Sequence, residues 1–289
     1  MNRAILFAFL AAALYALNSP LSKLLLNSAP PAMMAGFLYL GAGAGMAALG
    51  FFRRKTGRGR KETRLTKRDL PYTAGMILLD IAAPIFLMIG LSSATAANAS
   101  LLNNFEIVAT SVIALVFFHE RISGRLWFAI ALIVLDSAML SLEDAGSLRF
   151  SAGSLFVVLA SVCWGLENNC TRMLSRGDLL EIVVIKGFGS GIGSVLIGFA
   201  AGEDLPPAGD ILRILLLGFV AYGLSIYFYV YAQRDLGAAK TSACYAVAPF
   251  IGAGLSFLIF RDVPGALFFA ALGLMAAAAL LINRDQQAA

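Results

Sequence analysis

The chain has 289 residues, of which 60% are hydrophobic and only 13% are charged, and its mean hydropathy is +0.82. This composition would expose far too much apolar surface in water, which excludes an ordinary soluble protein. Inside a bilayer only helices or a closed barrel satisfy the backbone, and the apolar runs here are continuous rather than alternating. The sequence therefore predicts an all-α integral membrane protein.

Ten apolar stretches of the chain approach the length of about 20 residues that a helix needs to cross a bilayer. In chain order they are 4–26, 32–52, 71–91, 97–118, 125–142, 152–173, 180–201, 210–232, 239–260 and 263–283. The loops between them are short, which leaves little of the chain for a domain outside the membrane. We expect a bundle of ten transmembrane helices.

Positive charge is concentrated between Arg53 and Arg68, where nine Lys or Arg residues follow the second span. Basic loops of membrane proteins face the cytoplasm, and an even number of spans puts both termini on that same side. This orientation leaves four basic residues outside, namely Lys23, Arg149, Arg213 and Arg261. The net charge of +5 does not predict a nucleic-acid partner, because there is no soluble face on which basic and stacking groups gather.

Cofactor and enzyme chemistry find little support in the sequence. Cys163, Cys170 and Cys244 all fall inside apolar spans and do not form a disulfide framework. The single histidine, His119, lies at a span end beside Glu120, and no zinc or haem motif is present. We therefore expect no cofactor, no metal and no enzymatic activity. A lipid scramblase or an intramembrane enzyme is the alternative from another class.

The two halves of the sequence resemble each other. Leu10–Leu25 (LAAALYALNSPLSKLL) aligns with Leu159–Leu174 (LASVCWGLENNCTRML) at a separation of 149 residues. Ala114–Glu120 (ALVFFHE) aligns with Ser256–Asp262 (SFLIFRD) at a separation of 142 residues. Each half holds five spans, and an odd number of crossings turns the second half upside down relative to the first. Inverted repeats are typical of secondary transporters, which bind substrate near the midplane of the membrane.

The repeat motifs resemble those of the drug/metabolite transporter superfamily, and in particular its ten-span members built from two EamA repeats. Besides the polar first span of each half, the residues that carry the resemblance are Ala99, Ser100, Thr241, Ser242, Glu120 and Asp262. A proline common in the fourth and ninth spans of these transporters stands at Pro249, whereas the first half has Ile107. The resemblance implies a first repeat over residues 1–145 and an inverted second repeat over 150–285.

Among these transporters the chain is most similar to the YddG-type exporters of aromatic amino acids. That resemblance implies export of amino acids and related small amphiphiles from the cytoplasm across a bacterial inner membrane. The expected mechanism is alternating access, and the expected partners are a small-molecule substrate and the lipid bilayer.

Polar side chains at membrane depth are expensive to bury, so each is a candidate functional residue. Tyr15 and Asn18 share one helical face of the first span, and their repeat partners Trp164 and Glu167 share a face of the sixth. We expect these two faces to oppose each other across the pseudo-two-fold axis. The candidate substrate-binding residues are Tyr15, Asn18, Asp80, Asn103, Glu106, Trp164, Glu167, Asn168, Tyr222 and Tyr245.

These residue types suit an aromatic amino acid. Its ring would stack on Trp164 or Tyr222, its ammonium would meet a carboxylate or a ring face, and its carboxylate would meet an asparagine amide. The same lining would suit a lipophilic cation, so a multidrug exporter is the alternative within transport. Acids at mid-depth could also carry a coupling proton.

Some of these polar and aromatic residues could instead have structural roles. The buried acids could pair with Lys186, the only basic residue predicted well inside a span, although this lysine could instead snorkel to the inner surface. Tyr227, Tyr229 and Tyr231 lie near the end of a span and are typical of an interfacial aromatic belt.

Overall fold

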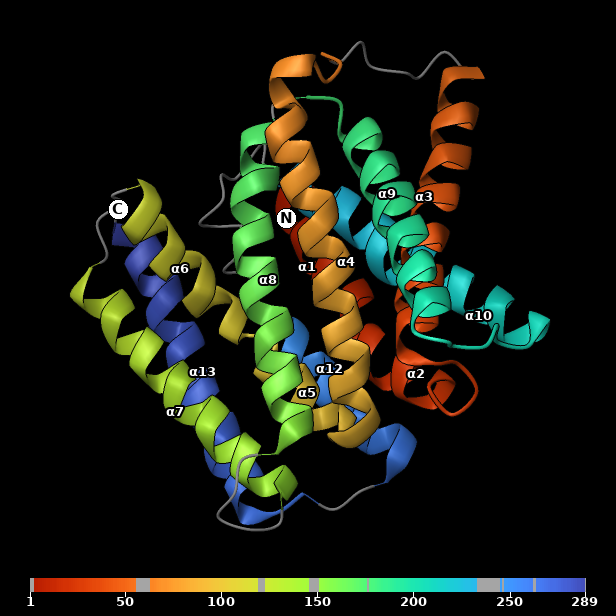
Figure 1. Cartoon of the computed structure of the whole chain (residues 1–289). Coiled ribbons are helices and arrows are strands. Elements are labelled where there is room, and N and C mark those ends of the chain that lie inside the picture. Colours follow the sequence, from red (N-terminus) through yellow and green to blue (C-terminus); the bar gives the residue numbers. More distant parts are fainter. Residues whose placement is uncertain are drawn as a thin grey trace.

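The computed structural model describes residues 3–55, 63–118, 123–145, 151–175, 177–232, 245, 247–261 and 264–288. Every regular element within these ranges is helical, and most of the long helices run roughly side by side to form a bundle (Figure 1). Several residues singled out above lie outside the described ranges, namely His119, Glu120, Arg149, Thr241, Ser242, Cys244 and Asp262. The prediction of an all-α membrane fold is confirmed.

The first half of the bundle contains helices α1 to α7. They are α1 (Arg3–Ala16), α2 (Asn18–Leu25), α3 (Pro31–Lys55), α4 (Leu70–Ser93), α5 (Ala96–Leu102), α6 (Phe105–Phe118) and α7 (Gly124–Ala145). A short 3-10 turn, η1 (Lys67–Asp69), precedes α4. The pairs α1/α2 and α5/α6 each correspond to one predicted span, so this half has five crossings.

The second half contains the remaining helices. They are α8 (Ala152–Leu174), α9 (Leu179–Ala200), α10 (Ala208–Gly218), the π-helical segment η2 (Phe219–Leu224), α12 (Ala248–Phe260) and α13 (Ala266–Ala288). The helix that begins with α10 continues through η2 to Ala232 and forms one crossing. This half also has five crossings, which gives ten transmembrane helices in two inverted repeats.

Five of the described helical segments are long and apolar enough on their own to cross a membrane. They are Arg3–Leu25, Pro31–Arg53, Lys67–Ser93, Leu179–Ala200 and Ala208–Ala232. The other predicted spans are also helical but are interrupted, shorter or more polar. Large apolar side chains cover the outside of the bundle: Leu78, Leu196 and Leu258 are 66%, 62% and 76% exposed. Such a surface is compatible with lipid rather than with water.

Two predicted spans are interrupted near mid-membrane. The first breaks at Leu17, because Pro20 has no N–H to donate to the carbonyl of Ala16. The fourth breaks at Asn103 and Asn104. Their carbonyls accept hydrogen bonds from the backbone nitrogens three residues further along the chain, those of Glu106 and Ile107, at 3.1 and 2.9 Å. In the equivalent ninth span, Pro249 lies in the first turn of α12.

Equivalent helices of the two halves pack against each other. α3 runs along α9, α7 runs along α13, and α5 packs on α12. The α3–α9 crossing is close: a Cβ placed on Gly187 would lie 2.4 Å from the backbone nitrogen of Gly43. A Cβ on Gly191 would lie 2.7 Å from the nitrogen of Leu40. The glycines therefore allow backbone contact between the repeats, as small residues do in membrane bundles.

Two loops also tie the repeats together, one at each end. The carboxylate of Glu203, after α9, accepts hydrogen bonds from the backbone nitrogens of Ala32 and Met33 at 3.1 and 2.8 Å, at the start of α3. At the other end Glu181 accepts from the nitrogen of Leu65 at 3.2 Å. We call these contacts the Glu203 clasp and the Glu181 clasp.

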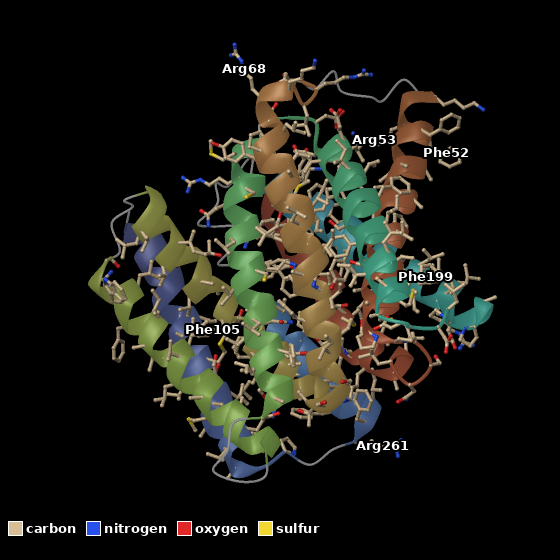
Figure 2. The ribbon with its side chains drawn as sticks, viewed as in Figure 1. Phe52, Arg53, Arg68, Phe105, Phe199 and Arg261 are labelled. Carbon is tan, nitrogen blue, oxygen red and sulfur yellow. The ribbon has the colours of Figure 1, made fainter. Side chains whose placement is uncertain are left out.

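Labelled arginines lie at both ends of the bundle, and two of them gather at one end (Figure 2). Arg53 and Arg68 lie at one end together with the exposed ring of Phe52, and Arg261 lies at the opposite end (Figure 2). Arg53 donates a hydrogen bond to the hydroxyl of Tyr227, and its guanidinium lies 5.7 Å from the centroid of that ring. We refer to the end with Arg53 and Arg68 as the basic end.

Candidate functional site

Three charged side chains meet in the middle of the bundle. The Nζ of Lys186 on α9 lies 3.0 Å from Asp80 Oδ2 on α4 and 3.0 Å from Glu167 Oε1 on α8. Lys186, Asp80 and Glu167 are only 5%, 0% and 2% exposed. Tyr39 on α3 donates its hydroxyl to Asp80 Oδ1 at 2.8 Å, and Thr171 donates to Glu167. Lys186 therefore points into the protein, and the snorkelling interpretation is wrong.

We call Asp80, Glu167 and Lys186 the charged cluster. Two carboxylates share one ammonium, so the fully ionised cluster carries one excess negative charge. Removing charges from water is costly unless each is paired and hydrogen-bonded, and here the lysine joins three helices of the bundle. The cluster fixes α4, α8 and α9 to one another and makes the interior electrostatically negative.

A run of tyrosine rings leads away from the charged cluster. The centroids of Tyr39 and Tyr222 are 5.0 Å apart, those of Tyr222 and Tyr15 are 6.1 Å apart, and those of Tyr15 and Tyr245 are 5.6 Å apart. Tyr229 follows at 5.0 Å from Tyr245 and so extends this run. These five rings come from α1, α3, the α10–η2 crossing and residue 245. Together they form what we call the tyrosine run.

The candidate faces of the first and sixth spans are bridged by these groups. Asn18 donates its amide to the hydroxyl of Tyr222 at 3.0 Å. The ring of Tyr222 packs on Tyr39, whose hydroxyl binds Asp80. The charged cluster then completes the connection to Glu167. The expected direct opposition of the two faces is therefore replaced by a connection through side chains of η2, α3, α4 and α9.

Glu106 provides a further carboxylate beside the tyrosine run. It lies in the first turn of α6, and it accepts a hydrogen bond from the amide of Asn168 on α8. Asn168 also donates to Thr110 Oγ1 at 3.4 Å. Within the described residues no lysine or arginine pairs with Glu106. Its charge interacts with Tyr15 and Tyr245, two members of the tyrosine run.

The remaining candidates have different surroundings. Asn103 is 7% exposed at the break between α5 and α6, and its Oδ1 has no hydrogen-bond partner among the described residues. Trp164 is 6% exposed and belongs to the main hydrophobic core rather than to the tyrosine run. Asp136 on α7 is fully buried, and neither of its oxygens has a hydrogen-bond partner in the described part of the chain.

The structure thus gathers Tyr15, Asn18, Asp80, Tyr222 and Tyr245 into one connected set, together with the acids of α6 and α8. Sequence reasoning missed Tyr39 and gave no fixed role to Lys186. The signal for Lys186 was its position as a lone base among several buried acids. A single tyrosine in an apolar span such as α3 gives no comparable signal, because lipid-facing tyrosines have the same pattern.

An inverted-repeat bundle with a buried polar site is typical of membrane transporters. Over residues 2–142 and again over residues 151–284, the chain matches the EamA-like transporter family. The chain belongs to this family. Membership establishes a multi-pass membrane transporter, and it implies a small-molecule substrate and contact with the lipid bilayer.

A relative and a solved structure are similar to the chain. An uncharacterized transporter from Methanothermobacter thermautotrophicus is 27% identical over 266 residues, which cover 86% of this chain and 76% of the relative. A solved structure described only as a crystal structure of a protein has a TM-score of 0.70 at 20% identity. It covers 96% of this chain and 94% of its own, and it supports the fold alone.

Proposed function

We propose that the protein exports small amphiphiles that carry an ammonium group, with aromatic amino acids as the main substrates, by alternating access. The observation that carries this proposal is the composition of the site. Carboxylates outnumber cations, and five tyrosine rings lie beside them. A positively charged nitrogen attached to a ring or chain is the chemistry that both features attract.

In this proposal Glu106 receives the substrate ammonium. It is the acid of the site that forms no ion pair with a described lysine or arginine, and its charge interacts with Tyr15 and Tyr245. The substrate ring packs against the tyrosine run. The amide of Asn168 and the unpaired carbonyl of Asn103 supply hydrogen bonds to the polar end of the substrate. Trp164 shapes the adjoining apolar wall.

A lipophilic cation is the second candidate substrate, and the excess of carboxylates favours it. A cation without a carboxylate would need only the acid and the rings, whereas a zwitterion must also satisfy its own negative group. The two candidates therefore differ in whether the substrate carboxylate contributes to binding.

We also propose that the basic end faces the cytoplasm of a bacterial plasma membrane and that both termini lie on that side. The observation is the gathering of Arg53 and Arg68 at one end of the bundle. A protease-sensitive tag fused to either terminus should resist protease added to the outside of intact cells. Cleavage of the tag in intact cells would contradict this orientation.

Reconstituted liposomes test the substrate. Uptake of labelled phenylalanine should saturate and should be inhibited by tyrosine, but not by lysine or threonine. Uptake of a lipophilic cation without uptake of phenylalanine would instead assign the protein to multidrug transport. Liposomes without protein give the background rate for both labels.

Two site variants should then change transport. Glu106→Gln should reduce phenylalanine uptake at least tenfold because it removes the charge that meets the ammonium, and Trp164→Ala should alter selectivity among aromatic substrates. Leu196→Ala, on the exposed side of α9, is the matched control and should transport normally. Wild-type rates and selectivity in both site variants would refute the assignment.

A further inference from the structure

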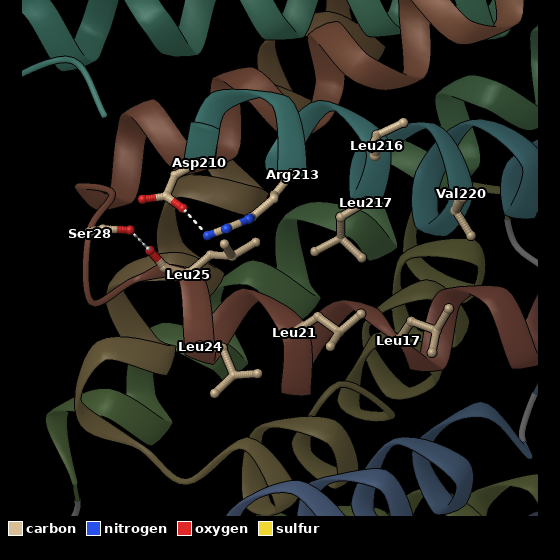
Figure 3. A pocket seen from close by; sticks show the side chains of 10 residues that line it. All are labelled: Leu17, Leu21, Leu24, Leu25, Ser28, Asp210, Arg213, Leu216, Leu217 and Val220. Atoms are coloured by element: carbon tan, nitrogen blue, oxygen red, sulfur yellow. Dashed lines mark hydrogen bonds and ion pairs between the residues drawn. The ribbon is translucent and has the colours of Figure 1, made fainter. Parts of the chain in front are cut away.

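A groove lies between α2 and α10, away from the basic end of the bundle (Figure 3). Leu17, just before α2, and Leu21 on α2 face Leu217 on α10 and Val220 on η2, and the volume between the walls is about 690 Å³. Binding sites for small molecules span about 300 to 1,000 Å³ and are mostly apolar. The groove therefore has the size and lining of a small-molecule site.

The groove opens to the bilayer. Leu24 and Leu216 also line it, and their side chains are 43% and 57% exposed. At the rim Arg213 donates to Asp210 at 2.8 Å, and the arginine side chain is 72% exposed whereas that of the aspartate is 15% exposed. The rim thus offers one acidic and one basic group where the apolar walls end.

The inner end of the groove touches the candidate site. Leu17 precedes Asn18, and Val220 lies within η2 two residues before Tyr222. The hydrogen bond from Asn18 to the Tyr222 hydroxyl, at 3.0 Å, spans the two walls at this depth. Both walls are irregular at this point, because α1 ends at Ala16 and η2 is a π-helical turn. Helix breaks and π-helical turns are where helices bend most readily.

The equivalent positions of the other repeat are closed. The repeat separations of 149 and 142 residues relate Leu21 to Cys170 and Leu217 to Gly75. A Cβ placed on Gly75 would lie 3.0 Å from the sulfur of Cys170, so α4 and α8 are in contact there. Inverted repeats exchange such arrangements during transport. The structure is therefore open between α2 and α10 and closed at the related positions near the basic end.

We propose that the groove between α2 and α10 is the exit portal of the exporter and binds the apolar part of the departing substrate. This inference rests on the proposed function. The substrate would pass the Asn18–Tyr222 contact, place its ring or chain against the leucines, and present its ammonium and carboxylate to Asp210 and Arg213. An amphiphile with an apolar part would thus leave sideways, between two helices, rather than along the axis of the bundle.

Groove-filling variants test the portal. Leu217→Trp should lower phenylalanine uptake in liposomes at least tenfold while phenylalanine still raises the unfolding temperature of the purified protein. Leu212→Trp is the matched control on the same helix, because Leu212 is 59% exposed but does not line the groove. A wild-type rate in Leu217→Trp would overturn the portal.

Cross-linking gives a second readout that a folding defect does not mimic. In a protein with Cys163, Cys170 and Cys244 replaced by alanine, Leu21→Cys and Leu217→Cys together should be joined by a bifunctional thiol reagent with a cleavable linker. Uptake should fall at least tenfold relative to the untreated double variant and return on cleavage, and the reagent should not change the uptake of either single cysteine variant.

The outcomes separate the portal from the function itself. Ligand stabilisation that persists in the cross-linked protein, with uptake unaffected, would overturn the portal and leave the proposed function intact. Absence of ligand stabilisation and of uptake in the wild type would overturn the proposed function and the portal with it. Loss of a co-purified phospholipid from Leu217→Trp without any change in uptake would identify the groove as a structural lipid site.

Discussion

Two related contacts between the repeats differ sharply in their chemistry. Where α4 and α8 meet, Asp80 and Glu167 are joined by Lys186 through two ion pairs of 3.0 Å. Where the first span meets η2, the repeat-related positions hold Asn18 and Tyr222, joined by one neutral hydrogen bond of 3.0 Å. The first contact is closed by packing, whereas the second borders the groove. Contacts at matched positions of the two repeats can thus be held by interactions of different strength.

The difference has a consequence for alternating access. A transporter must open each contact in turn, so both must be breakable at moderate cost. The neutral contact can open by losing one hydrogen bond, whereas the charged cluster opens only if its charges find other partners. The charged contact should therefore open less readily than the neutral one.

The largest effect should come from removing the ammonium of the charged cluster. Lys186→Met leaves two buried carboxylates side by side, and breaking a buried ion pair in this way costs about 3 to 5 kcal/mol. Thermal unfolding in detergent should show a large drop in melting temperature. The triple variant Lys186→Met, Asp80→Asn, Glu167→Gln should recover much of it. Unchanged melting of the single variant would contradict a stabilising role.

A buried acid outside both contacts should behave in the opposite way. Neither oxygen of Asp136 has a hydrogen-bond partner among the described residues, and such a group costs about 1 to 3 kcal/mol. Asp136→Leu should therefore raise the melting temperature and leave uptake unchanged. Asp136→Asn keeps a polar group and should raise the melting temperature less. Loss of uptake in Asp136→Leu would show that this acid takes part in transport.

The neutral contact should be far weaker than the charged one. Tyr222→Phe removes the oxygen that accepts from Asn18 and should cost about 1 kcal/mol, the usual net value of one neutral hydrogen bond. The decrease in melting temperature should be a fraction of that for Lys186→Met. Tyr231→Phe, whose ring packs on Phe7 near the span end, is the control. A decrease in melting temperature as large as that of Lys186→Met would show that the neutral contact is as strong as the charged one.

The smallest effect should come from the Glu203 clasp, which holds the start of α3. Its carboxylate accepts two backbone hydrogen bonds at the positive end of a helix dipole. A charge placed there contributes about 0.3 to 1 kcal/mol, so Glu203→Gln should lower the melting temperature slightly. The decrease should shrink in high salt. A decrease that does not depend on salt would assign the clasp to packing rather than charge.

Much of the fold could be predicted from the sequence because lipid imposes simple requirements. Apolar runs of sufficient length located all ten spans, and the repeat separations related the two halves. The interruptions were missed. The span 4–26 breaks at Leu17 and the span 97–118 breaks at Asn103 and Asn104, because hydropathy does not sense a lost backbone hydrogen bond. The π-helical turn of η2 was missed for the same reason.

The candidate site was harder to predict. Matched positions in the repeats pointed to Tyr15, Asn18, Asp80, Glu167 and Tyr222, because buried polar groups stand out against an apolar span. Lys186 was named as a possible partner of the acids, but its pairing could not be decided, since the depth of one lysine depends on how the helices pack. The order of the tyrosine rings likewise depends on contacts between distant helices, which a single sequence does not contain.

The most direct test of the central claim, that the site recognises an ammonium group, is a comparison of three ligands on the purified protein. Phenylalanine, phenethylamine and phenylpropionate share a ring, but phenethylamine lacks the carboxylate and phenylpropionate lacks the ammonium. We predict that phenylalanine and phenethylamine raise the melting temperature of the wild type, that phenylpropionate does not, and that Glu106→Gln abolishes the response. Stabilisation by phenylpropionate, or an undiminished response in Glu106→Gln, would contradict the claim.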